Sequence, residues 1–291
     1  MPHIAVIGNY GGWSSEHLAD CVANVTGRRL LVDMNSVCLD LSHEKVWFEG
    51  VDLTRLDAVI IKKIGPYYSP HLLDRLEILR FLEHKGVRVF SRPLNILRVL
   101  DRLSCTITLR MAGIPMPETA ITEDTSHALR LIRDFQEAVL KPLYSTKARG
   151  MQVVRYDKDA HLDVEIFKQD NPIMYIQKKL DIRGKDLGIV FLGGEYVTTY
   201  ARCNDSASWN TSTENGGRYM AYDPGPETIE VARKAQSLFD LDFTSVDVVE
   251  TEDGPLVFEV SAFGGFKGME IARNMDGAKL YLDYVLKRIE S

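Results

Sequence analysis

Two acidic residues inside apolar runs constrain the fold of this chain more than any other feature of its sequence. Asp247 stands in the run 245–249, and Glu259 stands in the run 257–260, which leads into a turn at Gly264 and Gly265. Short apolar runs bounded by turn signals are typical of buried strands. We therefore expect two strands, 243–250 and 255–260, that pair as a hairpin or in parallel and hold both carboxylates side by side in an apolar setting.

Two neighbouring carboxylates in an apolar setting repel each other and resist ionisation unless a cation neutralises them. Carboxylate oxygens are hard ligands that suit Mg²⁺ or Mn²⁺, the ions that accompany nucleotide phosphates. The pattern therefore predicts a metal site at Asp247 and Glu259. The alternative, one acid that caps the last helix and one that is exposed on a hairpin, stays open from these two segments alone.

The size and charge of the chain limit the classes of protein to which it can belong. Its 291 residues are enough for two domains, or for one large α/β unit with a lobe. With 45% hydrophobic and 26% charged residues, its composition is that of an ordinary globular protein. The formal net charge of −6 argues against general binding of nucleic acid, because phosphate binding needs a basic surface.

The cysteines and histidines predict no metal site. Cys21, Cys38, Cys105 and Cys203 lack the CxxC spacing of zinc sites and form no disulfide framework, so we expect reduced thiols. The seven histidines show no ligand spacing either. Because an apolar strand pattern stands at the start of the sequence, we expect no signal peptide, and no apolar stretch reaches the roughly 18 residues of a membrane span. We expect a cytoplasmic protein without membrane contact.

The first third of the chain alternates strands with a helix. We expect strands at 4–7, 29–33, 36–40, 58–62 and 88–90, and a helix at 72–84 whose leucines recur at helical spacing. Such alternation predicts a parallel sheet covered by helices. Residues 9–14 follow the first strand, where open α/β sheets often bind ligands, although a tight turn at Gly11 and Gly12 is the simpler interpretation.

The rest of the chain has mixed α and β patterns after a linker at Pro115 and Pro117. We expect helices at 101–112, 160–168, 227–239 and 269–289, and strands at 138–141, 151–155, 174–180, 187–192 and 196–201 besides the two acidic strands. Residues 203–221 form a long polar segment, and a loop of that length in a compact domain is usually functional or disordered.

Several polar side chains follow these strands. Lys141 ends an apolar strand, and because burying an unpaired ammonium is costly, its partner is either a nucleotide phosphate or a nearby acid. Arg202 borders the polar segment and Asn210 lies within it, and the two predict a clamp for phosphate or carboxylate oxygens, unless that segment is a solvated surface loop. The end of strand 174–180 offers backbone groups to an adenine ring, and Asp186 offers an acceptor to a ribose hydroxyl; a basic exposed turn is the alternative.

The order of these features is more specific than any one of them. The chain carries, in sequence, Asp101-Arg102, Gly113, Pro115, Pro117, Lys141-Pro142, Ile176-Gln177, Asp186, Arg202, Asn210, Gly216-Gly217, Asp247 and Glu259. This series resembles the ATP-grasp superfamily, in particular the RimK-type carboxylate–amine ligases, which include α-L-glutamate ligases. The likeness extends from about residue 60 to the last helix. The chain also looks like the ATP-grasp member of the bacterial GAK-system gene cluster.

The resemblance implies an architecture in two parts. An α/β N-terminal domain of the Rossmann-like, pre-ATP-grasp kind would occupy residues 1–98, and an α+β ATP-grasp domain would occupy residues 99–291. The ATP-grasp domain would consist of a lid subdomain at about 115–180 and a C-terminal metal- and nucleotide-binding subdomain at 181–291. ATP would be gripped between these two subdomains.

The resemblance also implies roles for particular residues. The catalytic residues would be Lys141 and Arg202; the cofactor-binding residues would be Arg102, Lys141, Gln177, Lys178, Lys179, Asp186 and Asn210, with Ser208 nearby; and the metal ligands would be Asp247, Glu259 and Ser261. The implied cofactors are ATP and Mg²⁺ (or Mn²⁺). Such ligases phosphorylate a carboxylate and let an amine displace the phosphate. The implied substrates are an amino acid, a peptide or a protein terminus, and homo-oligomers are common.

Departures from the family pattern leave other functions open. Ser145 and Ala148 replace two glycines of the loop after the phosphate-binding lysine, so we expect a stiffer loop. Ser261 replaces a metal-binding asparagine, and Gly188 replaces an arginine that meets the phosphate or acylphosphate. Besides an ATP- and Mg²⁺-dependent ligase, we therefore retain two hypotheses: a nucleotide-binding regulatory or partner protein with impaired chemistry, and a kinase that acts on a small molecule.

Overall fold

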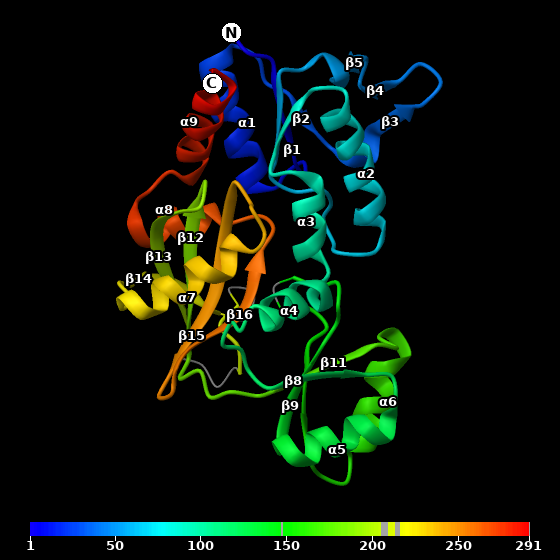
Figure 1. Ribbon diagram of the computed structural model, residues 1–291, viewed down its shortest axis with the longest axis vertical. Helices are drawn as coiled ribbons and strands as arrows, with labels where there is room; N and C mark the ends of the chain where they lie inside the picture. The colour runs from blue at the N-terminus through cyan, green and yellow to red at the C-terminus, as the bar shows by residue number, and fades with distance from the viewer. Residues whose placement is uncertain (147, 205–208, 213–215, 291) are drawn as a thin grey trace.

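A parallel β-sheet forms the centre of the N-terminal part of the molecule (Figure 1). The computed structural model describes residues 1–146, 148–204, 209–212 and 216–290. The sheet has the order β2-β1-β6-β7, and its strands are β1 (Ile4–Ile7), β2 (Leu31–Val32), β6 (Ala58–Ile61) and β7 (Arg88–Phe90). All neighbours pair in parallel. Every side chain of β1 and β6 is buried, as in a sheet that is covered on both faces.

Helices from both ends of the chain cover this sheet. Ala5 and Ile7 share an apolar cluster with α2 (His71–His84). Ile4 and Val6 point the other way and share a second cluster with α1 (Trp13–Thr26) and α9 (Gly277–Glu290). The first and last helices therefore pack side by side, and Figure 1 shows both chain ends at the same side of the molecule.

Smaller elements complete the N-terminal part. A three-stranded sheet has the order β3-β4-β5 and consists of β3 (Val37–Asp40), β4 (Lys45–Phe48) and β5 (Val51–Asp52). Helix α3 (Pro93–Leu100) begins with a proline, which is favourable in a first helical turn. Helix α4 (Arg102–Met111) follows at once and is capped by Asp101, whose side chain accepts from the Leu103 amide.

An antiparallel sheet and two helices form the lobe at the bottom of Figure 1. The strand order is β10-β9-β11-β8, with β8 (Thr119–Thr122), β9 (Glu137–Lys141), β10 (Gln152–Arg155) and β11 (Met174–Lys178). Alternate residues such as Leu140 and Ile176 form a cluster with α5 (Thr125–Phe135) and α6 (Ala160–Asp170). Lys141 and Gln177 belong to the other face of the sheet, which is turned toward the rest of the molecule.

A second antiparallel sheet carries the two predicted acids. Its order is β14-β13-β12-β15-β16, with β12 (Lys185–Leu192), β13 (Glu195–Cys203), β14 (Arg218–Ala221), β15 (Phe243–Thr251) and β16 (Gly254–Ser261). Helices α7 (Pro226–Ser237) and α8 (Phe266–Arg273) pack against it. Strands β15 and β16 form an antiparallel hairpin, so of the two pairings that we considered, the hairpin is confirmed.

The structure corrects several sequence-based expectations. Helix α1 was missed, because its N-cap Gly12 offers no side-chain cap, and the glycines preceding it read only as a turn. The single helix predicted at 269–289 is two helices, separated at Asn274, whose φ of 53° is left-handed. Helices α3 and α5 and strand β8 were not predicted. The end of the expected polar loop at 203–221 is strand β14.

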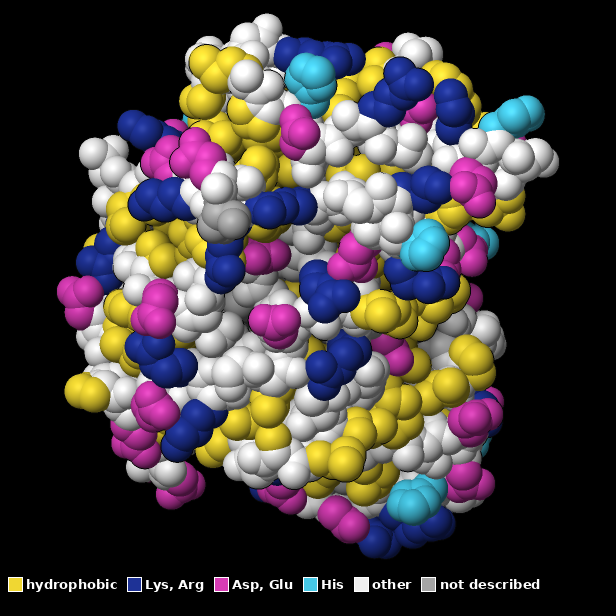
Figure 2. Space-filling view, turned by 45° about the horizontal axis from the view of Figure 1, so that its top comes forward, with side chains coloured by type: hydrophobic (Ala, Val, Ile, Leu, Met, Phe, Trp, Pro, Cys, Tyr) yellow, Lys and Arg dark blue, Asp and Glu magenta, His cyan; other side chains and the backbone are white. Residues whose placement is uncertain are grey.

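The charges on the surface are mixed. On the face shown in Figure 2, basic and acidic side chains are interspersed among polar and apolar ones, without a continuous basic area in the part that the structure describes. Among the described residues, no helix combines the length and the apolar character that crossing a membrane requires.

Candidate active site between the two antiparallel sheets

A cavity of about 360 Å³ lies where helix α4, the lobe sheet and the C-terminal sheet meet. All eleven residues that sequence analysis proposed for the site line it: Arg102, Lys141, Gln177, Lys178, Lys179, Asp186, Arg202, Asn210, Asp247, Glu259 and Ser261. They come from α4, from six strands of two sheets and from two connecting segments, the one after β11 with Lys179 and the one between β13 and β14 with Asn210. The first and the last of them are more than half the chain apart. Ser208 lies outside the described residues.

The two acids are cross-strand neighbours. Asp247 of β15 and Glu259 of β16 are Cα partners in the hairpin, next to an irregularity in the register. Burial raises the pKa of the Asp247 carboxyl to about 7; the Arg202 guanidinium opposes this rise, whereas Glu259 and Asp186 add to it. Among the described residues, Oδ1 of Asp247 is buried without a hydrogen-bond partner. A buried orphan oxygen next to a second carboxylate is a suitable ligand for a cation.

Two arginines neutralise these acids. Nη2 of Arg202 lies 2.9 Å from Oδ2 of Asp247, and the same guanidinium donates to both carboxylate oxygens of Asp186. Burial alone would lower the pKa of Arg202, but the charges of Asp186 and Asp247 hold it well above its ordinary value. Nη1 of Arg102 donates to Oε2 of Glu259 at 2.8 Å. The pairs keep cationic groups beside the acids, which an apolar setting requires.

Lys141 is the most desolvated cation of the cavity. It ends β9 and is 7% exposed, and burial together with the Arg102 charge lowers its pKa to about 7, against a smaller opposing effect of Glu259. Its Nζ donates to Oε1 of Gln177 at 2.5 Å and lies 5.2 Å from the centre of the Phe258 ring. A neutral amide and a ring leave most of its charge uncompensated, so an anion would stabilise the ammonium.

The residues expected around the base and ribose have protein partners. Nζ of Lys179 donates to Glu137 at 2.8 Å, and Lys178 pairs with Glu118, which directly precedes β8. Oδ1 of Asn210 accepts from the Ser212 amide at 3.1 Å and shapes the loop locally. The Asp186 carboxylate, which we expected to accept from a ribose hydroxyl, is buried and held by Arg202 and by the Thr211 hydroxyl.

Sequence analysis missed Tyr200, which fills the space beside Gly188. Gly188 is the Cα partner of both Tyr200 and Asp247, so it lies between them in the sheet. A Cβ atom at Gly188 would lie 2.4 Å from Cζ of Tyr200, and one at Gly268 would lie 2.6 Å from the same ring. The ring thus requires glycine at both positions, and it lines the cavity where the resemblance implies an arginine. Gly188 and Gly268 were the only signal in the sequence for a large side chain at this place.

The loop after Lys141 keeps the backbone shape that glycine favours. Ala148 has a φ of 60° and Gly150 a φ of 68°, both left-handed. An alanine in this region is strained by the order of 1 kcal/mol. Ser145 is in contact with Arg102, whose Nη2 lies 3.4 Å from its hydroxyl oxygen. Of the two glycine replacements, Ala148 therefore keeps a left-handed backbone at a cost in strain, and Ser145 contacts Arg102.

Comparison with known proteins gives the family. Residues 99–285 match the RimK-like ATP-grasp domain. A tetrahydromethanopterin:alpha-L-glutamate ligase from Methanosarcina acetivorans is 26% identical over 261 residues, which cover 80% of this chain and 81% of the relative. A probable alpha-L-glutamate ligase from Legionella pneumophila is also 26% identical, over 85% of this chain and 82% of the relative.

Solved structures show the same fold. The ATP-grasp ligase PsnB, complexed with a phosphomimetic variant of its minimal precursor, Mg and ADP, superposes with a TM-score of 0.76 at 18% identity, over 98% of each chain. A RimK domain ATP-grasp protein from Sphaerobacter thermophilus superposes with a TM-score of 0.74 at 20% identity, over 97% of this chain and 98% of the other. The family match over most of the chain, together with this fold, shows that the chain belongs to the RimK-like ATP-grasp family, whose named relatives are ligases.

Proposed function

We propose that this protein is an ATP- and Mg²⁺-dependent carboxylate–amine ligase that works through an acylphosphate. The observation that carries the proposal is that Arg102, Lys141 and Arg202 line one cavity together with the adjacent carboxylates of Asp247 and Glu259. Oδ1 of Asp247 is buried there without a hydrogen-bond partner among the described residues. Phosphoryl transfer depends on such positioning and charge neutralisation more than on a covalent nucleophile. Structures of ATP-grasp ligases with ADP and Mg bound, and relatives named glutamate ligases, support the same chemistry.

The residues of the cavity divide into three groups in this proposal. Asp247, Glu259 and Ser261 would hold Mg²⁺ (or Mn²⁺), whose charge would stabilise the transferring phosphoryl group. Lys141 and Arg102 would bind phosphate oxygens, and Arg202 would neutralise charge on the reacting groups. Gln177, Lys178, Lys179, Asp186 and Asn210 would border the base and the ribose.

The division of the chain into domains is part of the proposal. We infer an N-terminal α/β domain of the pre-ATP-grasp, Rossmann-like kind over residues 1–98 and an ATP-grasp domain over 99–291. The lobe sheet would be the lid at about 115–180, and the C-terminal sheet would be the metal- and nucleotide-binding subdomain at 181–291. The acceptor and donor would be an amino acid, a peptide or a protein terminus, and the protein would act as a cytoplasmic homo-oligomer.

Calorimetry tests the nucleotide site. ATP and ADP should bind to the wild type with Mg²⁺ present and much less without it, since two carboxylates in the cavity repel the phosphates unless a cation lies between them.

Lys141→Ala should abolish binding, because the desolvated ammonium is the phosphate partner. Asp247→Asn and Glu259→Gln should abolish Mg²⁺-dependent nucleotide binding with little unfolding. Lys185→Ala changes a lysine outside the lining of the cavity and should leave binding intact. Normal Mg-ATP binding in both acid variants would refute the metal assignment.

A screen for turnover then separates the ligase from its main alternative. ADP release that requires both a carboxylate and an amine would support ligation. The alternative, a nucleotide-binding regulatory or partner protein, is favoured by one observation: the Tyr200 ring occupies the region where the resemblance implies an arginine for the acylphosphate. Tight Mg-ATP binding without product formation over broad substrate pools would establish that alternative instead.

A further inference from the structure

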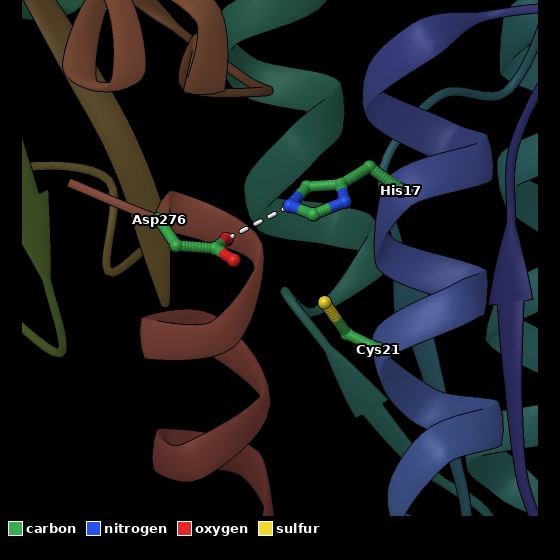
Figure 3. A group of neighbouring side chains, drawn as sticks. All are labelled: His17, Cys21 and Asp276. Carbon is green, nitrogen blue, oxygen red and sulfur yellow. Dashed lines mark hydrogen bonds and ion pairs between the residues drawn. The ribbon is translucent and has the colours of Figure 1, made fainter. Parts of the chain in front are cut away.

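We propose that His17, Cys21 and Asp276 form a binding site for Zn²⁺, or for a similar divalent ion that accepts nitrogen and sulfur ligands, away from the cavity (Figure 3). An imidazole nitrogen, a thiol sulfur and a carboxylate oxygen of these residues all lie within 4.8 Å of one another. Nitrogen, sulfur and oxygen donors are the set from which zinc sites are built. The proposed ligase function uses none of the three residues.

Two helices bring the three side chains together. His17 and Cys21 are four residues apart on α1, so both lie on one face of that helix. Leu18 and Val22 of the same helix belong to the buried core cluster. Asp276 directly precedes α9, which packs against α1. Figure 3 shows His17 and Cys21 pointing from α1 toward Asp276 on the facing segment.

The distances between the three donor atoms are close to those in a metal site. Nε2 of His17 lies 3.0 Å from Oδ1 of Asp276. Donors in a tetrahedral zinc site lie about 2.0–2.3 Å from the ion, and therefore about 3.3–3.8 Å from one another. The separations between the three donor atoms, all within 4.8 Å, exceed this range by about 1 Å at most. Rotation of the cysteine and histidine side chains can close such a gap without a shift of the helices.

Neighbouring groups hold two of the ligands in place. Oδ1 of Asp276 accepts from the backbone amides of Ala278 and Lys279 at 3.0 Å each, which fixes the carboxylate at the start of α9. The Trp13 ring stacks on the His17 ring with a centroid distance of 5.3 Å. Outer contacts of this kind orient ligands in metal sites and reduce the entropy that binding costs.

The donor set distinguishes this site from the cavity. The cavity acids offer oxygen, which suits Mg²⁺, whereas thiolate and imidazole favour Zn²⁺ or Co²⁺. Three protein ligands leave a fourth position for water, and the thiol proton passes to solvent when the ion binds. An ion at this position would link the first helix of the chain to the last one.

Bound Co²⁺ has absorption bands that Zn²⁺ lacks, so Co²⁺ serves as the spectroscopic probe of the site. Co²⁺ is titrated into reduced, metal-free, full-length protein with an excess of Mg²⁺. We expect a thiolate-to-cobalt charge-transfer band in the near ultraviolet and tetrahedral bands in the visible, which saturate at one ion per chain and disappear when Zn²⁺ is added. The competing explanation, a hydrogen bond between His17 and Asp276 beside an unrelated cysteine, predicts no thiolate band. Its absence at stoichiometric Co²⁺ would overturn the proposal.

Variants assign the band to these residues. Cys21→Ser should remove it, and His17→Gln and Asp276→Asn should each weaken binding at least about tenfold. Asparagine is a good N-cap, so the Asp276 variant should keep α9 intact. The matched control is Cys38→Ser, at an exposed cysteine on β3, which should keep the band. Survival of the band in Cys21→Ser, or wild-type affinity in His17→Gln, would refute the site.

Failure of this proposal and failure of the ligase proposal are distinguishable. Asp247→Asn should lose Mg²⁺-dependent nucleotide binding and keep the cobalt spectrum, whereas Cys21→Ser should show the reverse. Loss of the thiolate band in Asp247→Asn would contradict a separate site at α1 and α9.

Discussion

Replacing Lys141 by methionine should change how the stability of the nucleotide-free protein depends on pH. Burial lowers the pKa of Lys141 to about 7 in the folded protein, from its ordinary value of 10.5. Between these two values the unfolded chain binds more protons than the folded one, so the contribution of this lysine to stability rises with pH. The variant lacks this contribution, since methionine carries no proton.

The magnitude follows from the two pKa values. At pH 7 the folded lysine is about half protonated while the unfolded one is fully protonated, and by pH 9 the difference approaches one proton. With 1.36 kcal/mol per proton and per pH unit, the wild type should gain about 2 kcal/mol relative to Lys141→Met between pH 7 and pH 9. At pH 7 and below, the variant should have its largest relative stability, because the buried charge costs most there.

Urea unfolding measures this difference. Curves are recorded at pH 7 and pH 9 by circular dichroism and by tryptophan fluorescence, whose coincidence checks that unfolding has two states. Lys178→Met is the matched control: the Lys178 side chain is 41% exposed at the edge of the same cavity, and its removal should shift both curves alike. A difference between wild type and Lys141→Met that is the same at both pH values would show that the Lys141 ammonium is not desolvated, and the reasoning would fail.

Two further predictions concern other parts of the site. Gly188→Ala should lower stability by about 1–3 kcal/mol, because its Cβ would lie 2.4 Å from Cζ of Tyr200. Gly225→Ala adds a Cβ with no atom within 4 Å and should lower stability by about 0.5–1 kcal/mol, because alanine is a poorer N-cap of α7 than glycine. Thermal unfolding compares the two, and a loss that is no larger for Gly188→Ala than for Gly225→Ala would contradict the packing argument. Mn²⁺ affinity, followed by electron paramagnetic resonance without nucleotide, should rise about tenfold from pH 6 to pH 8, since the Asp247 carboxyl, with a pKa of about 7, must lose its proton to bind the ion. An affinity that is constant over this range would argue against Asp247 as a ligand.

The acidic hairpin and the lysine could be predicted from the sequence because each is a polar residue inside a strongly apolar run. The pairing of Arg202 with Asp186 and Asp247 could not. These three residues stand on different strands, and their proximity depends on the registers that align Asp186 with Arg202 and Gly188 with Asp247. A register is set by packing across the whole sheet, and a shift by one residue would turn each of these side chains to the other face.

The elements that could not be predicted lack a distinctive local signal in the sequence. Helix α1 begins at a glycine without a capping side chain, so its start carries no sequence signal. The break between α8 and α9 depends on Asn274, a residue that tolerates a left-handed conformation but also occurs within helices. His17 and Cys21 lie on one face of that unpredicted helix, and Asp276 follows that unpredicted break. The proposed zinc site therefore became visible only in the structure.

The packing of α9 on the N-terminal sheet has a consequence for the order of events during protein synthesis. Ile4, Val6 and helix α1 leave the ribosome first, yet part of the apolar cover that they share comes from Ala278, Tyr281 and Leu282 near the end of the chain. Until those last residues are released, one face of the parallel sheet stays incompletely covered, and an exposed apolar face favours association with chaperones or other nascent chains. Premature termination shortly before α9 would thus impair the beginning of the molecule, far in sequence from the lost residues.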